Sequence, residues 1–296
     1  MSLYSTVVKK FCRVIFNFWQ ALGVHITPVH FYSPIPDTAA LPKRLWQKQS
    51  ALPGLDLRIA EQLVLLKQLA KFKKEYDALP RQGRLPEFYL QNHSFESVDA
   101  EVLYSMIRCH KPKRIWEIGS GMSTLLAAQA LEKNRAEGHA GELVVFEPYP
   151  AKFLRMGFPG LTRLVQKPIQ DIPVKEFQKL QAGDILFIDS SHVLKIGSDV
   201  QYEYLEILPR LNPGVMVHVH DIFWPGEYPE QWVKHEHRFW TEQYLFQAFL
   251  AFNRDFQILL SNHYLHVTQP AALRKAFASY NSKTVKPGSV WMVRVG

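Results

Sequence analysis

Two short motifs in the second half of the sequence carry groups that could do chemistry. Asp189-Ser-Ser-His192 places a carboxylate and an imidazole three residues apart, directly after an apolar run, and His220-Asp221 ends another apolar run. Carboxylate oxygens suit hard divalent cations, and an imidazole gains and loses a proton near neutral pH. These residue types could therefore hold a divalent ion and remove a proton from a hydroxyl group.

The stretch Arg114–Thr124 predicts a binding turn. Its sequence, R-I-W-E-I-G-S-G-M-S-T, is a short apolar strand, a glycine turn and the start of a helix. Glycines in such a turn let backbone N–H groups approach a ligand, and Ser123 or Thr124 can cap the helix. The spacing lacks the third glycine of the dinucleotide fingerprint, and the acidic Glu117 suits a cationic ligand.

Short apolar runs alternate with helical patterns along the rest of the chain. After the strand that begins at Arg114, further strands are expected at Glu142–Glu147, Arg163–Gln166, Asp184–Asp189, Gly214–Asp221, Phe256–Leu260 and Val290–Val295. Strands and helices in this order predict a doubly wound α/β fold with a mostly parallel sheet covered on both faces.

The motif E-I-G-S-G-x-S-T, together with the strand order that follows it, resembles the class I S-adenosylmethionine-dependent methyltransferases over residues 91 to 296. The resemblance implies a seven-stranded Rossmann-like sheet whose last strand is antiparallel, at or near an edge. It also implies binding of S-adenosylmethionine, with the carboxylate after the second strand on the ribose hydroxyls. The cofactor-binding candidates are Glu117, Gly119, Ser120, Gly121, Ser123, Thr124, Glu147 and Asp189.

The D-x-x-H motif and the aspartate after the fifth strand resemble the methyltransferases that act on sugar hydroxyls in antibiotic biosynthesis, and the cephalosporin hydroxylase-like proteins. This resemblance implies that the two strand ends are neighbours, that Asp189 and Asp221 bind Mg²⁺ or Mn²⁺, and that His192 is the base. His220, where those relatives tend to have an acidic residue, is a third candidate ligand, and its nitrogen favours a softer metal than Mg²⁺. Helix capping by the aspartates and a backbone hydrogen bond of His192 are the structural alternatives.

Composition excludes several classes of protein. The chain has 296 residues and a formal net charge of +8, but its lysines and arginines form no basic run, so no nucleic-acid partner is expected. Its two cysteines give neither a disulfide framework nor a metal-binding spacing, which favours a reducing, cytoplasmic location.

Residues 1–90 are expected to form a helical extension that serves as a lid, a dimer contact or a membrane-surface contact, and residues 91–296 are expected to form the S-adenosylmethionine-binding methyltransferase domain. Val7–Leu22 is apolar and aromatic with a basic edge, which predicts an amphipathic helix that packs on the domain, contacts a second subunit or touches anionic lipid. Leu55–Tyr76 has helical periodicity, and Ser97 is expected to cap the helix before the first strand.

The acceptor pocket is expected beside the fifth strand. Ile222–Trp232 is a loop rich in aromatic, proline and acidic residues, and a helix is expected over His237–Leu250. Aromatic faces of this kind can cover a sugar ring. The candidates for substrate contact are Tyr32, Glu227, Tyr228, Arg238 and Tyr244.

These patterns together favour an enzyme that methylates a hydroxyl of a saccharide or another small metabolite. Two alternatives stay open. The same fold serves N- and C-methyltransferases and hydroxylase-like enzymes, and the amphipathic segment would also suit a non-catalytic, membrane-associated partner protein.

Overall fold

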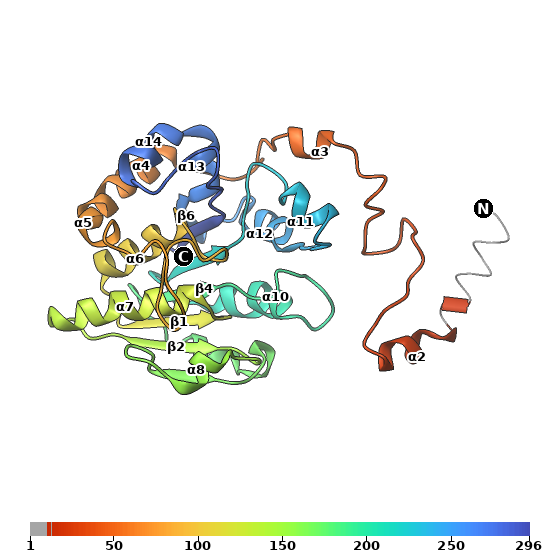
Figure 1. Ribbon diagram of the computed structural model, residues 1–296, viewed down its shortest axis with the longest axis horizontal. Coiled ribbons are helices and arrows are strands. Elements are labelled where there is room, and N and C mark those ends of the chain that lie inside the picture. Colours follow the sequence, from red (N-terminus) through yellow and green to blue (C-terminus); the bar gives the residue numbers. More distant parts are fainter. Residues whose placement is uncertain (1–10, 13) are drawn as a thin grey trace. The chain divides into compact units, whose positions relative to one another are not determined.

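A computed structural model describes residues 11–12 and 14–296 (Figure 1). The chain forms two compact units, which are described separately. The N-terminal unit comprises the chain up to Lys48 together with Glu227–Phe239, and the sheet unit comprises Gln49–Gly226 and Trp240–Gly296.

The sheet unit contains a seven-stranded sheet in the order β3-β2-β1-β4-β5-β7-β6. Its strands are β1 (Arg114–Ile118), β2 (Glu142–Phe146), β3 (Arg163–Val165), β4 (Ile185–Ile188), β5 (Met216–His220), β6 (Phe256–Ser261) and β7 (Ser289–Arg294). The first five run parallel to one another, and β7 pairs antiparallel with both β5 and β6. The predicted doubly wound, mostly parallel α/β fold is confirmed, with the antiparallel β7 next to the edge strand β6.

Helices cover both faces because neighbouring side chains of each strand point to opposite sides. One face, which includes Ile115 and Phe187, packs against α4 (Ile59–Leu69), α5 (Lys73–Tyr76), α6 (Asp99–His110), α7 (Met122–Ala136), α13 (Asn262–Thr268) and α14 (Pro270–Ala276). The other face, which includes Trp116 and Ile188, packs against α9 (Val174–Phe177), α10 (Asp199–Tyr202), η3 (Glu203–Ile207), η4 (Leu208–Arg210) and α12 (Glu242–Leu250). Figure 1 shows α7 beside β1 and β2 in this arrangement. The sheet is therefore buried on both sides, and its ligand sites must lie at its ends.

The parallel strands end together at one edge of the sheet. Backbone N–H groups just beyond the strands continue the hydrogen-bond ladder, since Gly119 N donates to Phe146 O at 3.0 Å and Asp189 N donates to Ile118 O at 2.9 Å. Glu147 N likewise donates to Val165 O at 3.1 Å. This ladder brings the glycine turn and two of the predicted strand-end carboxylates to one edge.

Two local predictions are wrong. The helix expected over His237–Leu250 begins only at Glu242, because the backbone N–H groups of Thr241 and Glu242 bind the carbonyl of His192 at 2.9 and 3.1 Å. Ser97 does not cap α6, because its hydroxyl pairs instead with the hydroxyl of Ser279 at 2.6 Å.

The compact units divide after Lys48, whereas the sequence placed the division at residue 90. Leu66, Leu69 and Tyr76 are buried in the same core as α6, so the predicted helix of Leu55–Tyr76, found as α4, η1 (Ala70–Phe72) and α5, belongs to the sheet unit. A role of residues 1–90 as a lid, dimer contact or membrane contact stays a prediction.

The N-terminal unit has little regular structure. It contains α2 (Phe16–Ala21), α3 (Arg44–Gln47) and α11 (Glu230–Lys234), and the indole of Trp46 donates to the carbonyl of Tyr228 at 2.8 Å. The amphipathic helix predicted at Val7–Leu22 lies partly outside the described residues. Over the residues that the structure describes, each helix is too short or too polar to span a bilayer.

The remaining short elements are α8 (Lys152–Met156), which follows β2, and η2 (Ile169–Asp171), which follows β3.

Candidate active site

The glycine turn after β1 requires a glycine at position 119. Gly119 has a φ of 90°, in the left-handed region that favours glycine. A Cβ atom there would lie 1.8 Å from the carbonyl oxygen of Asp189. Position 119 must therefore be a glycine, because the ends of β1 and β4 lie so close together. The same close approach brings Asp189 next to the turn.

Glu117, Ser123 and Thr124 lie behind the turn. The Ser123 hydroxyl donates to Glu117 at 2.5 Å, and the Thr124 hydroxyl accepts from Gly121 N at 3.0 Å, so both hydroxyls hold the start of α7. Burial raises the pKa of Glu117 to about 8 despite the hydrogen bond from Ser123, because the charged form loses its hydration. Glu117 is thus mainly neutral at pH 7, unlike the anionic group that the sequence suggested.

Glu147 faces a pocket at the carboxyl edge of the sheet, and Ser120 holds its carboxylate. The Ser120 hydroxyl donates to one Glu147 oxygen at 2.9 Å, and Tyr149 N donates to the other at 2.8 Å. The pocket has a volume of about 430 Å³ and extends along the edge from Glu147 past Gly119 to Asp189. A carboxylate fixed in this way can accept hydrogen bonds from two adjacent hydroxyls.

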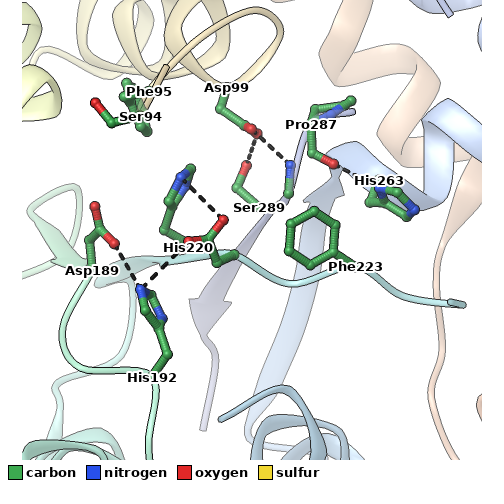
Figure 2. A network of polar contacts seen from close by, with 12 residues as sticks. Ser94, Phe95, Asp99, Asp189, His192, His220, Phe223, His263, Pro287 and Ser289 are labelled. Carbon is green, nitrogen blue, oxygen red and sulfur yellow. Dashed lines mark hydrogen bonds and ion pairs between the residues drawn. The ribbon is translucent and has the colours of Figure 1, made fainter. Parts of the chain in front are cut away.

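Asp189, His192 and Asp221 meet beside this pocket, as the sequence predicted. The Nε2 atom of His192 lies 3.2 Å from Asp189 Oδ1 and 3.6 Å from Asp221 Oδ2, and Figure 2 shows the ring pointing to Asp189. One ligand atom from each of the three lies within 4.8 Å of the others. The imidazole is only 7% exposed, whereas the carboxylates of Asp189 and Asp221 are 25% and 16% exposed, so a small ligand can reach the oxygens.

The backbone at this site adopts an unusual conformation. His192 has a φ of 59° and Asp221 a φ of 54°, both in the left-handed region that residues with a side chain seldom adopt. Such conformations cost about 1–3 kcal/mol each and cluster at functional sites. They turn both side chains toward the same point beyond the strand ends.

The acidic neighbours hold His192 in its charged form. Burial alone would lower the pKa of His192, but the hydrogen bonds to Asp189 and Glu242 and the charges of Glu242 and Asp221 raise it well above its ordinary value. Burial alone would raise the pKa of Asp189, but the charge of His220 and the ion pair with His192 lower it to about 2. His192 and Asp189 therefore form an ion pair, whereas burial raises the pKa of Asp221.

His220 lies next to this group but outside it. Its Nε2 atom is 3.7 Å from Asp221 Oδ1, and its ring lies against Phe95 with centroids 5.0 Å apart. Its Nδ1 atom is buried and has no hydrogen-bond partner among the residues that the structure describes. The structure thus brings His192, rather than the predicted His220, into the group of possible metal ligands.

Glu242 was missed by the sequence reasoning. It is fully buried, and its Oε2 atom accepts a hydrogen bond from His192 Nδ1 at 2.8 Å. A glutamate in the first turn of a helix is usually a solvated residue that favours the helix dipole. Only the fold reveals that this carboxylate faces a histidine 50 positions earlier in the chain.

The predicted substrate contacts fall in both units. Tyr244 belongs to the sheet unit and is half exposed, whereas the other four belong to the N-terminal unit. In that unit the Arg238 guanidinium pairs with Glu236 at 2.7 Å, and the Glu227 carboxylate accepts from Tyr228 N at 2.8 Å. Contact of Tyr32, Glu227, Tyr228, Arg238 or Tyr244 with a substrate stays a prediction.

Comparison with known proteins identifies the family. Residues 116–222 match the family model described as a methyltransferase domain. The chain belongs to the class I methyltransferases. A protein of Archaeoglobus fulgidus, described as uncharacterized, is 31% identical to this methyltransferase over 175 residues, which is 56% of this chain and 78% of that protein.

Two solved structures share lower similarity with this methyltransferase. An O-methyltransferase from Bacillus cereus in complex with SAH is 15% identical with a TM-score of 0.38, over 79% of this chain and 90% of that chain. The apo form of a TDP-rhamnose 3'-O-methyltransferase of calicheamicin biosynthesis is 12% identical with a TM-score of 0.32, over 67% of this chain and 88% of that chain.

Proposed function

We propose that this methyltransferase transfers the methyl group of S-adenosylmethionine to a hydroxyl oxygen of a saccharide or another small metabolite. The observation that carries the proposal is the continuity of two sites at one edge of the sheet. A pocket that suits a nucleoside ends at Asp189, and Asp189 contacts a histidine that can accept a proton.

The nucleoside end of the cofactor would bind at Glu147 and Ser120. Glu147 is held by Ser120 and Tyr149 N and presents its carboxylate to the pocket, where it would accept hydrogen bonds from the two ribose hydroxyls. The cofactor's sulfonium end would then lie toward Gly119 and Asp189. An anionic edge of this kind favours a sulfonium cation.

The acceptor would lie beside His192 and Asp221. When bound, S-adenosylmethionine would supply the methyl group: the acceptor oxygen would attack the methyl carbon, the carbon–sulfur bond would break with its electron pair on sulfur, and S-adenosylhomocysteine would leave as a neutral thioether. The hydroxyl proton would pass to Nε2 of His192. Because its acidic neighbours raise the pKa of His192, the rate should rise with pH as the imidazole loses its own proton. General bases of this type contribute about 10²–10⁴-fold to the rate.

The same residues fit a divalent cation. The two partly exposed carboxylates of Asp189 and Asp221 lie close enough to share an ion beside His192. Asp189 and Asp221 would hold Mg²⁺ or Mn²⁺, which would orient adjacent acceptor hydroxyls and lower their pKa.

The test is incubation with S-adenosylmethionine and a panel of saccharides, with mass spectrometry of S-adenosylhomocysteine and of the methylated product. An O-methylated product is expected. EDTA should abolish transfer, Mn²⁺ or Mg²⁺ should restore it, and Asp221→Asn should not be restored. A product methylated on nitrogen or carbon, or a hydroxylated product without S-adenosylhomocysteine, would contradict the proposal, and full activity in EDTA would contradict the metal.

A further inference from the structure

We propose that Glu242 is a positioning residue, which fixes the His192 imidazole with its proton on Nδ1 and its basic nitrogen, Nε2, toward Asp189 and Asp221. The effect on catalysis rests on the proposed role of His192 as the base. The effect on the imidazole itself does not.

Both oxygens of the Glu242 carboxylate are engaged. Oε2 lies 2.8 Å from Nδ1 of His192, and Oε1 accepts a hydrogen bond from the Tyr204 hydroxyl at 2.9 Å. Glu242 and Tyr204 are both fully buried. The carboxylate therefore cannot turn away from the histidine without losing a buried hydrogen bond.

The first turn of α12 also holds the backbone of His192. Thr241 N and Glu242 N donate to the His192 carbonyl at 2.9 and 3.1 Å, and the Thr241 hydroxyl accepts from Leu194 N at 2.8 Å. These bonds fix the left-handed conformation of His192. Backbone and side chain of the histidine are thus held by one short segment, while its Nε2 faces the aspartates.

A carboxylate on Nδ1 has two chemical consequences. An ionised carboxylate only accepts hydrogen bonds, so Glu242 favours a proton on Nδ1 and Asp189 favours one on Nε2. The Glu242 contact is the shorter, at 2.8 Å against 3.2 Å, and Glu242 is fully buried whereas Asp189 is 25% exposed. Glu242 therefore holds the proton of the neutral imidazole on Nδ1 and leaves the Nε2 lone pair free. The negative charge also stabilises the imidazolium that forms when Nε2 takes a proton. The carboxylate of a Ser-His-Asp triad acts in the same way.

The substitution that tests this inference is Glu242→Gln. The Tyr204 hydroxyl should keep the amide oxygen, so that the amide NH₂ faces Nδ1 and forces the proton onto Nε2. The rate constant kcat should then fall by about 10²-fold or more with little change in the affinity for S-adenosylmethionine. Adding Tyr204→Phe frees the amide to rotate, and the double variant should recover part of the lost activity, which a merely structural role would not produce.

The matched control is Glu101→Gln, which neutralises another buried glutamate that is bonded to Ser279 rather than to His192. Its activity should equal that of the wild type. Equal activity of Glu242→Gln and wild type would overturn the inference.

Nitrogen-15 NMR of His192 shows which ring nitrogen carries the proton, and it tests the inference without a measurement of activity. In the chelator-treated wild-type protein at alkaline pH, Nδ1 should carry the proton, and Nε2 should carry it in Glu242→Gln. A wild-type protein with the proton on Nε2, or an unchanged tautomer in the variant, would overturn the role of Glu242. If the wild type transfers no methyl group, the proposed function fails, while this NMR result still stands on its own. If Glu242→Gln does not fold, the wild-type spectrum alone tests whether Nδ1 carries the proton.

Discussion

Glu117 and Glu147 belong to neighbouring strands of the sheet, yet only Glu147 faces the pocket. Glu117 is 1% exposed and bonded to Ser123, whereas Glu147 is half-buried and presents its carboxylate beside Ser120. The sequence identified both residues because each is an acid near a strand end. It could not tell which of them is buried, since that depends on tertiary contacts such as the hydrogen bond from Ser123 to Glu117.

Glu147→Ala should weaken binding of S-adenosylmethionine by about 1.5–3 kcal/mol, roughly ten- to a hundredfold, because two ribose hydroxyls lose their acceptor. Isothermal titration calorimetry measures the change. Glu142→Ala is the matched control, since it removes an acid from the opposite end of the same strand. Equal affinities of the two variants would contradict the assignment of Glu147.

Glu101 makes the stability of the protein depend on pH. Burial raises the pKa of Glu101 to about 7 from its ordinary value of 4.5, partly offset by the hydrogen bond from Ser279. Because the pKa is raised on folding, its contribution to stability is complete below about pH 4.5 and is lost as the pH rises through 7. At about 1.4 kcal/mol for each pH unit between the two pKa values, the loss in the free energy of unfolding is roughly 3 kcal/mol.

Urea unfolding at pH 5 and pH 8 tests this dependence. Glu101→Gln should lack this contribution to the change between the two pH values, so the wild type should lose more stability than the variant on going to pH 8. Parallel losses in both proteins would mean that Glu101 does not titrate in this range.

At the level of the elements, the end of β1 depends on one glycine. Gly119→Ala would place a methyl group against the Asp189 carbonyl, in a backbone conformation that alanine disfavours. We expect a loss of at least about 3 kcal/mol in the free energy of unfolding, since the β1 and β4 ends must separate. Gly138→Ala is the matched control, because Gly138 has a similar φ of 86° but, in the described part of the chain, no atom beyond its own neighbours lies within 4 Å of the added Cβ. Its loss should be about 1–2 kcal/mol, and similar losses for both variants in urea unfolding would rule out the clash.

The strands were predictable from sequence because each is a short apolar run, and four of the runs end at a glycine turn or a carboxylate. The start of α12 could not be predicted, because the backbone N–H groups of Thr241 and Glu242 bond to His192, which lies far away in the chain. The prediction that Ser97 caps α6 was wrong for the same reason, because the Ser97 hydroxyl pairs with Ser279. Local patterns predict elements, and tertiary hydrogen bonds decide where the elements begin.

At the level of the whole molecule, exposed apolar side chains concentrate in the N-terminal unit. Ten large apolar residues between positions 11 and 35 are at least 43% exposed: Phe11, Val14, Phe18, Leu22, Val24, Ile26, Val29, Phe31, Tyr32 and Ile35. Exposed apolar surface of this kind marks contacts with proteins or membranes. With the net charge of +8, it motivates the predicted peripheral contact with anionic lipid.

Phe31→Glu should lower co-sedimentation with phosphatidylserine-containing vesicles by about tenfold or more. It removes an aromatic group whose burial contributes about 1.5–3 kcal/mol and adds a charge that anionic lipid repels. Phe252→Glu is the matched control, since Phe252 is 84% exposed, close to the 78% of Phe31, but belongs to the sheet unit. If both variants sediment like the wild type, the apolar segment contacts a second subunit rather than lipid.

Light scattering tests that second contact. It should then give the mass of a dimer for the wild type and of a monomer for Phe31→Glu, because the Phe31 side chain would be buried between two subunits.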